Sequence, residues 1–451
     1  MSQRFPLPAA RPPLAARFLA DTAAVGEAIE RFGSPLHVVF PQVMAENATA
    51  LAGVLRRHGV PYDIFYAHKV NASAALLAEA SAVGLGADVA SAAELDRALA
   101  VGFALDRIEA TGPKSPAFIK RIAGLGVTVN ADDLWELDRL AAAAPAGSTV
   151  PVLLRLSGFA SPAVPQSRFG IDLADADAAL ETVRRAPGLD LRGVAFHLDT
   201  ADPAARVDAL TESMAVVAAA HRKGLRPSVI DIGGGFRQRF VEDPEPFQRY
   251  AQALAAAGPG DLVWPGHDVG ATAAHKYGNH RPATDVLERF LAAEIERRPV
   301  AEVLRECMLT LWIEPGKALV DHAGLTLASV LYRKRAAGHD LVVLDLSRNQ
   351  VTPADQEVLL DPVLVDGRGD PPAEGVFLAG RLCLESDLVS RRKVFLESEP
   401  SSGDVLAFVN TAAYQMDLSA SAAGGHPPPP KVAAVWDGER FAFVADDHHG
   451  S

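Results

Sequence analysis

Short apolar runs alternate with longer amphipathic stretches through the first two thirds of the chain. The apolar runs predict eight strands, at 63–67, 87–89, 107–110, 126–129, 150–156, 192–196, 228–232 and 308–313. Helices are predicted in amphipathic segments between them, including 72–81, 92–101, 116–125 and 211–222. Eight strands that alternate with helices are typical of an α/β fold, a (β/α)8 TIM-type barrel.

The pattern changes after residue 316. Six further strands are predicted between Gly, Pro and Asp turns, at 325–333, 340–346, 376–379, 405–409, 431–436 and 440–444. We therefore divide the chain into an N-terminal segment (1–40), a barrel (41–317) and a β-rich C-terminal domain (318–451).

Composition limits the classes of function. A chain of 451 residues with 49% hydrophobic content can bury a sizeable core. The net charge of −13, with no basic stripe, argues against nucleic-acid or anionic-membrane partners. No apolar run reaches 18 residues, and the proline-rich start lacks a signal-peptide core, so we expect neither a membrane span nor secretion. Cys307 and Cys383 lie far apart, which favours reduced thiols in the cytoplasm.

Polar residues that could take part in catalysis or binding lie where predicted strands end. They are Lys69, Asp88, His197, the glycines Gly233, Gly234 and Gly235, and Glu314. The carboxyl ends of barrel strands form the catalytic face of such folds, so we expect these residues to gather there. A buried lysine titrates low and can form a Schiff base, and glycine amides can surround a phosphate. Taken singly, each has an ordinary alternative: a solvated lysine, a core histidine or a glycine turn.

Five motifs stand in register along the chain. They are Tyr66-Ala67-His68-Lys69-Val70-Asn71, Asp88-Val89-Ala90-Ser91 with Glu94, His197-Leu198-Asp199-Thr200, Asp231-Ile232-Gly233-Gly234-Gly235-Phe236 and Glu314-Pro315-Gly316-Lys317; Cys383-Leu384-Glu385-Ser386-Asp387 follows. In this order and at these separations, residues 34 to 430 resemble the fold type III (alanine-racemase-like) enzymes that use pyridoxal 5'-phosphate. The resemblance is to the ornithine/diaminopimelate/arginine decarboxylase branch.

The resemblance implies a cofactor and a role for each motif residue. Lys69 would form the Schiff base, Glu314 would keep the pyridine nitrogen protonated, and the ring would stabilise the carbanion left by CO2. His197 would stack on the ring, and the glycines with Thr200 would hold the phosphate. The remaining pocket residues would be Asp88, Glu94 and Arg155.

The resemblance also implies a homodimer with shared active sites. Cys383 would reach the partner's pocket and protonate the carbanion, unless it is only a small buried side chain. Tyr414 would contact the cofactor across the same interface. The segment 35–40 would add a strand to the C-terminal domain.

Several positions depart from the family pattern. Lys317 stands where an arginine is usual, Asp199 replaces a glycine, and Leu384 replaces an acidic residue that reads the substrate. We assign Lys317, Arg348, Glu385 and Asp387 as candidate substrate contacts. The altered positions favour an amino-acid substrate that is modified or specialised.

A long insertion, about 255–305, precedes Glu314. Its segment 264–280 carries His267, His275, Lys276, Tyr277, Asn279 and His280. This segment is either a lid over the pocket or a surface insertion without a catalytic role. The histidine spacing matches no metal-binding motif, so no metal is expected.

Two alternative functions remain. A racemase of the same fold usually has an arginine at the pyridine nitrogen, so Glu314 argues against it. A non-catalytic homologue that binds protein partners is disfavoured by the retained Lys69, His197, glycines, Glu314 and Cys383.

Overall fold

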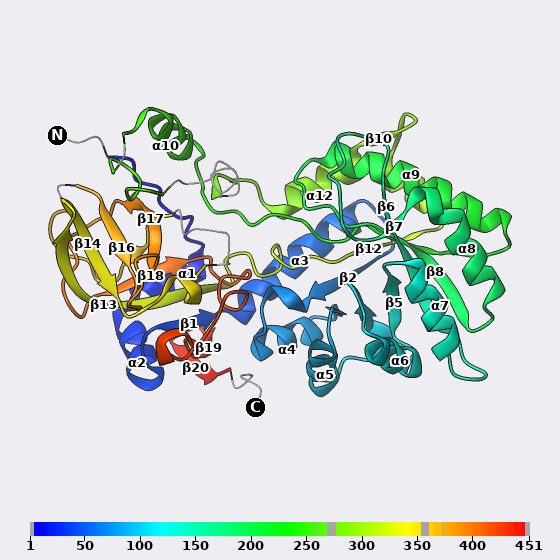
Figure 1. Cartoon of the computed structure of the whole chain (residues 1–451), viewed down its shortest axis with the longest axis horizontal. Helices are drawn as coiled ribbons and strands as arrows, with labels where there is room; N and C mark the ends of the chain where they lie inside the picture. Colours follow the sequence, from blue (N-terminus) through cyan, green and yellow to red (C-terminus); the bar gives the residue numbers. More distant parts are fainter. Residues whose placement is uncertain (1–3, 259, 268–276, 353–359, 373, 447–451) are drawn as a thin grey trace.

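The computed structural model of the chain describes residues 4–258, 260–267, 277–352, 360–372 and 374–446. Two bodies lie along the long axis of the molecule, a helix-covered barrel and a β-rich domain (Figure 1). The N-terminal helices α1 (Pro13–Ala20) and α2 (Thr22–Phe32) lie with the β-rich domain.

Eight parallel strands form the barrel. They are β2 (Tyr62–Ala67), β3 (Gly86–Val89), β4 (Ile108–Ala110), β5 (Thr128–Ala131), β6 (Val150–Ser157), β8 (Leu189–Ala195), β9 (Val229–Asp231) and β12 (Thr310–Ile313). Their order is β5-β4-β3-β2-β12-β9-β8-β6, and pairing of β5 with β6 closes the ring. This confirms the predicted barrel, and each predicted barrel strand corresponds to one observed strand. Short strands β7 (Ile171–Asp172), β10 (Glu294–Ile295) and β11 (Arg298–Pro299) decorate it.

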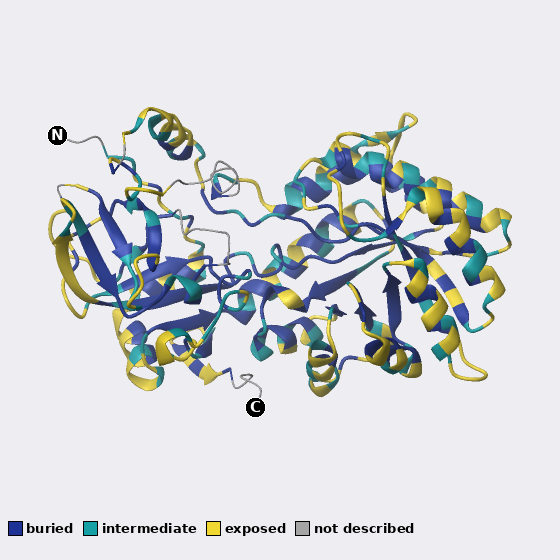
Figure 2. Ribbon diagram, viewed as in Figure 1, coloured by how far each residue is buried: buried dark blue, intermediate teal, exposed yellow. Residues whose placement is uncertain are grey.

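Helices surround the barrel with one face buried and the other exposed (Figure 2). They are α3 (Pro41–Arg57), α4 (Ala74–Ala82), α5 (Ala92–Val101), α6 (Pro116–Leu125), α7 (Leu134–Ala143), α8 (Ala176–Arg185), α9 (Pro203–Arg222), α12 (Ala283–Ala292) and α13 (Val300–Glu306). Helix α9 begins eight residues before the prediction, because Asp202 caps it and Pro203 occupies its first position. No helix in the described ranges is long and apolar enough to cross a bilayer.

The C-terminal domain is a mixed β-sheet that includes the N-terminal strand β1 (Leu36–Val39). The other strands are β13 (Gly324–Ala336), β14 (His339–Leu344), β15 (Val363–Leu364), β16 (Val376–Ala379), β17 (Leu388–Val394), β18 (Val405–Val409), β19 (Lys431–Trp436) and β20 (Phe441–Ala445). Strand β1 runs antiparallel to β13 and parallel to β19, as the resemblance implied.

Strand β17 was not predicted because it contains three consecutive basic residues, 391–393. The Arg392 side chain is fully buried, and its guanidinium lies 2.9 Å from Asp361 Oδ1. Asp361 also accepts hydrogen bonds from the Leu7 and Phe395 amides, at 2.7 and 3.0 Å. The buried ion pair therefore allows a basic residue inside this strand. Through the Leu7 amide, Asp361 also links the N-terminal segment to the sheet.

Part of the predicted insertion packs on the β-rich domain. Helix α10 (Glu245–Ala256) lies on this side of the molecule (Figure 1). The Trp264 ring lies 5.1 Å from that of Phe377, and the Trp264 amide donates to the Arg391 carbonyl at 2.8 Å. This portion of the insertion therefore contacts the β-rich domain. Residues 268–276 of the insertion, with His275 and Lys276, lie outside the described residues.

The buried ion pair predicts a stability effect. Asp361→Ala should lower the free energy of unfolding by about 3–5 kcal/mol, because Arg392 would remain buried without its carboxylate. Glu397→Ala, which removes an exposed pairing with Arg11 of the same N-terminal segment, should cost less than about 1 kcal/mol. Chemical denaturation measures both, and equal effects would contradict the role of burial.

Candidate active site

A cavity of about 290 Å³ opens at the carboxyl ends of the barrel strands. It is lined by side chains that include Lys69, His197, Glu314, Lys317 and Tyr414. A second hollow of about 420 Å³ shares Lys69, His197 and Glu314 with the first and adds Thr111 and Arg155. Three of the predicted catalytic residues thus border both spaces.

The Lys69 amine is held by a carboxylate. Its Nζ lies 2.7 Å from Asp88 Oδ2, and Asp88 Oδ1 accepts a 2.5 Å hydrogen bond from the Thr111 hydroxyl. Burial alone would lower the pKa of Lys69, but the charges of Asp88 and Glu314 raise this pKa above its ordinary value. The expectation of a low-titrating lysine is therefore wrong for this state. Lys69 is an ammonium ion that must release its proton before it can attack a carbonyl.

The glycine loop after β9 can exist only without side chains. Gly235 has φ +76°, and a Cβ there would lie 1.9 Å from the Leu198 carbonyl oxygen. A Cβ on Gly234 would lie 2.4 Å from the Glu314 carbonyl oxygen. The loop is pressed between two neighbouring strand ends, so its backbone forms part of the cavity wall. The Gly233 and Gly234 amides donate to Asp231 and His197, so the Gly235 amide is the one of the three that is left for a phosphate group.

His197 lies against the same loop. The Gly234 amide donates to its Nδ1 at 3.2 Å, and Glu314 Oε2 lies 3.6 Å from this nitrogen. Burial lowers the pKa of His197, although Glu314 opposes the shift. The imidazole is therefore neutral near pH 7, with Nδ1 as the acceptor, and it can cover a flat ring without adding charge.

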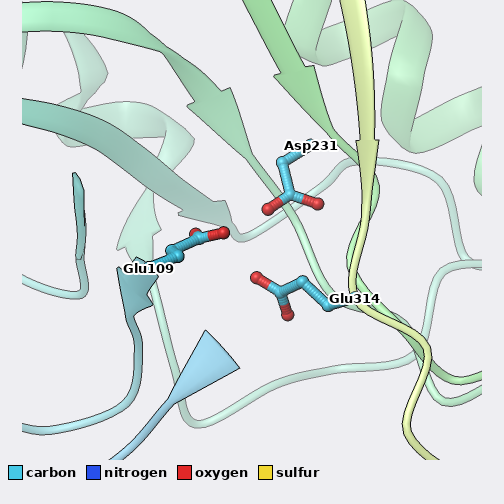
Figure 3. A group of neighbouring side chains, drawn as sticks. All are labelled: Glu109, Asp231 and Glu314. Atoms are coloured by element: carbon cyan, nitrogen blue, oxygen red, sulfur yellow. The ribbon is translucent and has the colours of Figure 1, made fainter. Parts of the chain in front are cut away.

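Three carboxyl groups meet inside the barrel (Figure 3). Glu109 from β4, Asp231 from β9 and Glu314 after β12 place carboxyl oxygens within 4.8 Å of one another. Asp231 accepts a 2.7 Å hydrogen bond from the Gly233 amide. Both Glu109 oxygens lack a hydrogen-bond partner among the described residues. Sequence reasoning missed Glu109 and Asp231; the signal was an acidic residue within an otherwise apolar strand.

The three groups differ in protonation. Burial raises the pKa of Glu109 well above its ordinary value, and the nearby Asp231 and Glu314 add to the shift. Burial and the charge of Glu314 likewise raise the pKa of Asp231. Burial also opposes ionisation of Glu314, but the Lys69 ammonium nearby helps to hold its pKa below the ordinary value. Glu314 thus holds the negative charge, while the other two groups keep their protons.

The other residues that the sequence predicted around the cofactor are Arg155, Thr200 and Glu94, and they differ in their contacts. Arg155 lies 3.6 Å from Asp132 and faces the second hollow. The Thr200 hydroxyl accepts a 3.0 Å hydrogen bond from the Asp202 amide, within its own loop. Glu94 accepts from the Ala90 amide at 2.6 Å and so closes the loop after β3.

Tyr414 requires a correction. The resemblance suggested that it reaches the cofactor across a subunit interface. In the structure it lines the cavity of its own chain, and its amide donates to the Val70 carbonyl at 2.8 Å. Tyr414 has φ +67°, a left-handed conformation that the turn after β18 imposes.

The predicted substrate residues are mostly apart from the cavity. Lys317 lines it, and its Nζ lies 2.7 Å from Asp199 Oδ1. The buried Asp387 carboxylate instead accepts from the Arg348 and Leu382 amides, both at 2.8 Å. Asp387 therefore shapes its own loop, and Arg348 lies beside it.

Cys383 and Glu385 are exposed and do not line the cavity of their own chain. The alternative that Cys383 is a buried hydrophobic side chain is therefore wrong.

One residue of the insertion lines the cavity. Tyr277 packs on Phe240, with ring centroids 4.6 Å apart, and accepts a 3.3 Å hydrogen bond from Gln415. This contact supports the lid interpretation for the described end of the segment. Tyr277 was only one of several polar residues in the insertion, and no periodic pattern distinguished it.

The protonated state of Glu109 predicts a pH-dependent stability difference. In the unfolded chain Glu109 ionises above pH about 4.5, whereas in the folded chain it stays neutral to a much higher pH. The wild type therefore loses stability through this interval, and Glu109→Gln does not. The variant should exceed the wild type by about 1–3 kcal/mol at pH 8, with the gain vanishing toward pH 4.5.

Thermal unfolding across this pH range measures the difference. Glu30→Gln, at an exposed position, should match the wild type at every pH. A Glu109→Gln difference that does not vary with pH would contradict the assignment.

Comparisons with known proteins agree with this geometry. Residues 45–259 match the family model "Pyridoxal-dependent decarboxylase, pyridoxal binding domain". The chain is 34% identical over 436 residues to the uncharacterised protein y4yA of Sinorhizobium fredii, covering 93% of this chain and 92% of that protein. It is 26% identical over 420 residues to the diaminopimelate decarboxylase of Pseudomonas fluorescens, with 89% and 88% covered.

The fold is shared with solved decarboxylases. The diaminopimelate decarboxylase from M. jannaschii in complex with L-lysine aligns with a TM-score of 0.74 at 21% identity, covering 93% of this chain and 90% of that one. The arginine decarboxylase of Paramecium bursaria Chlorella virus aligns with a TM-score of 0.66 at 18% identity, with 92% and 99% covered.

The lysine, the glycine cradle and the carboxylate fit pyridoxal phosphate. Lys69 opens into a cavity floored by glycines that exclude any Cβ, with the ionised Glu314 on its wall. The matched family model describes a domain that binds this cofactor. The chain belongs to the fold type III pyridoxal-phosphate-dependent decarboxylases, the family that includes ornithine, arginine and diaminopimelate decarboxylases.

Proposed function

We propose that this chain decarboxylates a modified or specialised amino acid with pyridoxal phosphate. One observation carries the proposal: the Lys69 amine, the ionised Glu314 and the glycine loop all border one cavity. Lys69 would hold the cofactor covalently, the loop of Gly233 to Gly235 would hold its phosphate, and Glu314 would hold its pyridine nitrogen. Bound pyridoxal phosphate supplies an electron sink for the carbon that loses CO2.

Charge placement supports a reaction that needs a strong electron sink. A carboxylate beside a pyridine nitrogen raises the proton affinity of that nitrogen. Glu314 carries this charge even though it is buried, because Asp231 and Glu109 remain protonated beside it. An arginine at this position, as in racemases, would have the opposite effect. The geometry therefore favours decarboxylation over racemisation.

Asp88, Thr111 and His197 surround the Lys69 amine and the space above Glu314. Asp88 fixes Lys69 at the mouth of both hollows and is itself held by Thr111. Neutral His197 covers one side of the space above Glu314. The Lys69 amine would also be able to carry a proton within the cavity, with Asp88 holding it in place.

The substrate side of the cavity supports a specialised substrate. Lys317 is paired with Asp199, so neither side chain is free to bind a substrate as a single charge. Arg237 and Tyr277 line the same cavity, and Tyr277 comes from the insertion. Diaminopimelate decarboxylases are the named relatives, but at 27% identity or less and with Leu384 at a substrate-reading position, we infer a different substrate.

We further propose a homodimer in the cytoplasm that completes each site with Cys383 from the partner subunit. Cys383 is exposed beside Leu384, which is 62% exposed, and Leu418 at the cavity is 63% exposed. Apolar side chains at these positions suit contact with a second copy. Cys307 and Cys383 are free thiols, in keeping with a reducing compartment.

Release of CO2 from a panel of amino acids tests the function. We expect turnover of N-acylated, carboxylated or otherwise modified amino acids and little turnover of diaminopimelate, ornithine or lysine. Lys69→Ala should reduce CO2 release to background and abolish the fixation of cofactor by borohydride. Lys334→Ala, on an exposed strand, is the matched control and should behave as the wild type. Efficient turnover of diaminopimelate would contradict the specialised substrate.

Mixing two variants tests the shared site. Lys69→Ala should be inactive and Cys383→Ala slow, and after subunit exchange the mixture should recover about a quarter of wild-type activity. The reason is that half of the dimers are mixed, and each mixed dimer has one intact site out of two. If both residues serve the same chain's site, the mixture gains nothing over the separate variants.

A further inference from the structure

Arg206 is an unusual buried cation. It lies in the first turn of α9 and is fully buried. Within the described ranges, no carboxylate lies at ion-pair distance from its guanidinium, which leaves the charge without the partner that buried arginines usually have. Burial lowers the pKa of Arg206 to about 10, and the charge of Asp199 opposes this shift, so the side chain remains a cation near neutral pH.

Backbone carbonyls take the place of a carboxylate. The guanidinium donates hydrogen bonds to four of them, Leu198 (3.1 Å), Thr200 (3.2 Å), Ile232 (3.2 Å) and Gly234 (2.7 Å). Its carbon also lies 4.5 Å from the centre of the Phe236 ring. Two carbonyls belong to the loop after β8, and two belong to the glycine loop after β9. One side chain therefore fixes both loops to each other at the catalytic face.

The direction of these carbonyls sets the direction of the amides that follow them. In a trans peptide the C=O and the next N–H point in opposite directions. Carbonyls of Thr200 and Gly234 that face Arg206 thus turn the amides of Ala201 and Gly235 away from it. Neither amide has a hydrogen-bond partner among the described residues. Gly235 lines the cavity that contains Lys69, whereas Ala201 lines a separate hollow that shares Arg237 with this cavity.

The charge near these amides also points to an anion. Lys317 stands at the position where relatives have an arginine. Its amine lies 2.7 Å from Asp199, and this carboxylate largely offsets the positive charge. No carboxylate in the described residues lies at ion-pair distance from Arg206 to offset its positive charge. The guanidinium lies on the carbonyl side of the peptides whose amides belong to Ala201 and Gly235. Outward-facing amides with a cation behind them form a site for a phosphate.

We propose that Arg206 is a positioning residue for the cofactor phosphate: it clamps the two loops so that the Gly235 amide faces the phosphate, and it supplies positive charge from behind this amide. The inference concerns cofactor binding and does not depend on which amino acid is decarboxylated. Arg206 does not touch the cofactor, so its effect is separable from that of direct ligands.

Binding of two aldehydes to the cofactor-free enzyme tests the proposal. Pyridoxal phosphate and pyridoxal differ only in the phosphate, and absorbance titration gives a Kd for each. In Arg206→Met the Kd for pyridoxal phosphate should rise about 10- to 100-fold, as expected for the loss of charge-assisted hydrogen bonds. The Kd for pyridoxal should change less than about 3-fold. Inorganic phosphate should compete with pyridoxal phosphate less effectively than in the wild type.

Two further variants complete the design. Arg222→Met changes an exposed arginine on the same helix and should leave both Kd values unchanged. Arg206→Lys keeps the charge but cannot reach four carbonyls, so it should selectively weaken pyridoxal phosphate to a smaller degree, and it serves if Arg206→Met does not fold. Equal weakening of the two aldehydes would reduce Arg206 to a structural role, and an unchanged Kd for pyridoxal phosphate would overturn the proposal.

Discussion

The site depends on the buried negative charge of Glu314. Glu314 can remain ionised there only because its surroundings supply compensation: the Lys69 ammonium on one side, and protonated Asp231 and Glu109 on the other. If Glu109 or Asp231 were also ionised, its carboxylate would repel that of Glu314 strongly, because the dielectric constant inside a protein is low. The groups around Glu314 thus hold its charge at a point that a pyridine nitrogen can reach. The closed ring of eight strands is what brings residues as distant as 69 and 314 to this point.

Much of this arrangement could be predicted from the sequence. The barrel strands follow from apolar runs, and Lys69, His197 and Glu314 were expected together because each follows such a run. The pattern did not reveal features that depend on a residue far away in the sequence. Arg391 to Lys393 hid strand β17, since only the pairing of Arg392 with Asp361 makes a buried basic strand possible. Glu109 gave no motif, because its importance arises from Asp231 and Glu314 across the barrel.

The departures from the family pattern also acquire a physical explanation. Lys317 in place of an arginine and Asp199 in place of a glycine are two changes that meet as one ion pair. Read separately, each was a departure from the family pattern, and Lys317 was a candidate substrate contact; together they form an ion pair that lines the cavity. Asp387, which resembled a substrate contact in sequence, holds two amides of its own loop. Proximity in the sequence to a family motif therefore did not guarantee a place in the cavity.

The path of the insertion has a consequence for how this enzyme can diverge. The chain leaves the barrel after the glycine loop, adds Val263 and Trp264 to the edge of β17, and returns with Tyr277 at the cavity. One continuous segment thus serves both the seam between the domains and the wall that a substrate meets. Changes of specificity made here are constrained by the fit of the two bodies, and a change at the seam can propagate to the choice of substrate without touching the reacting groups.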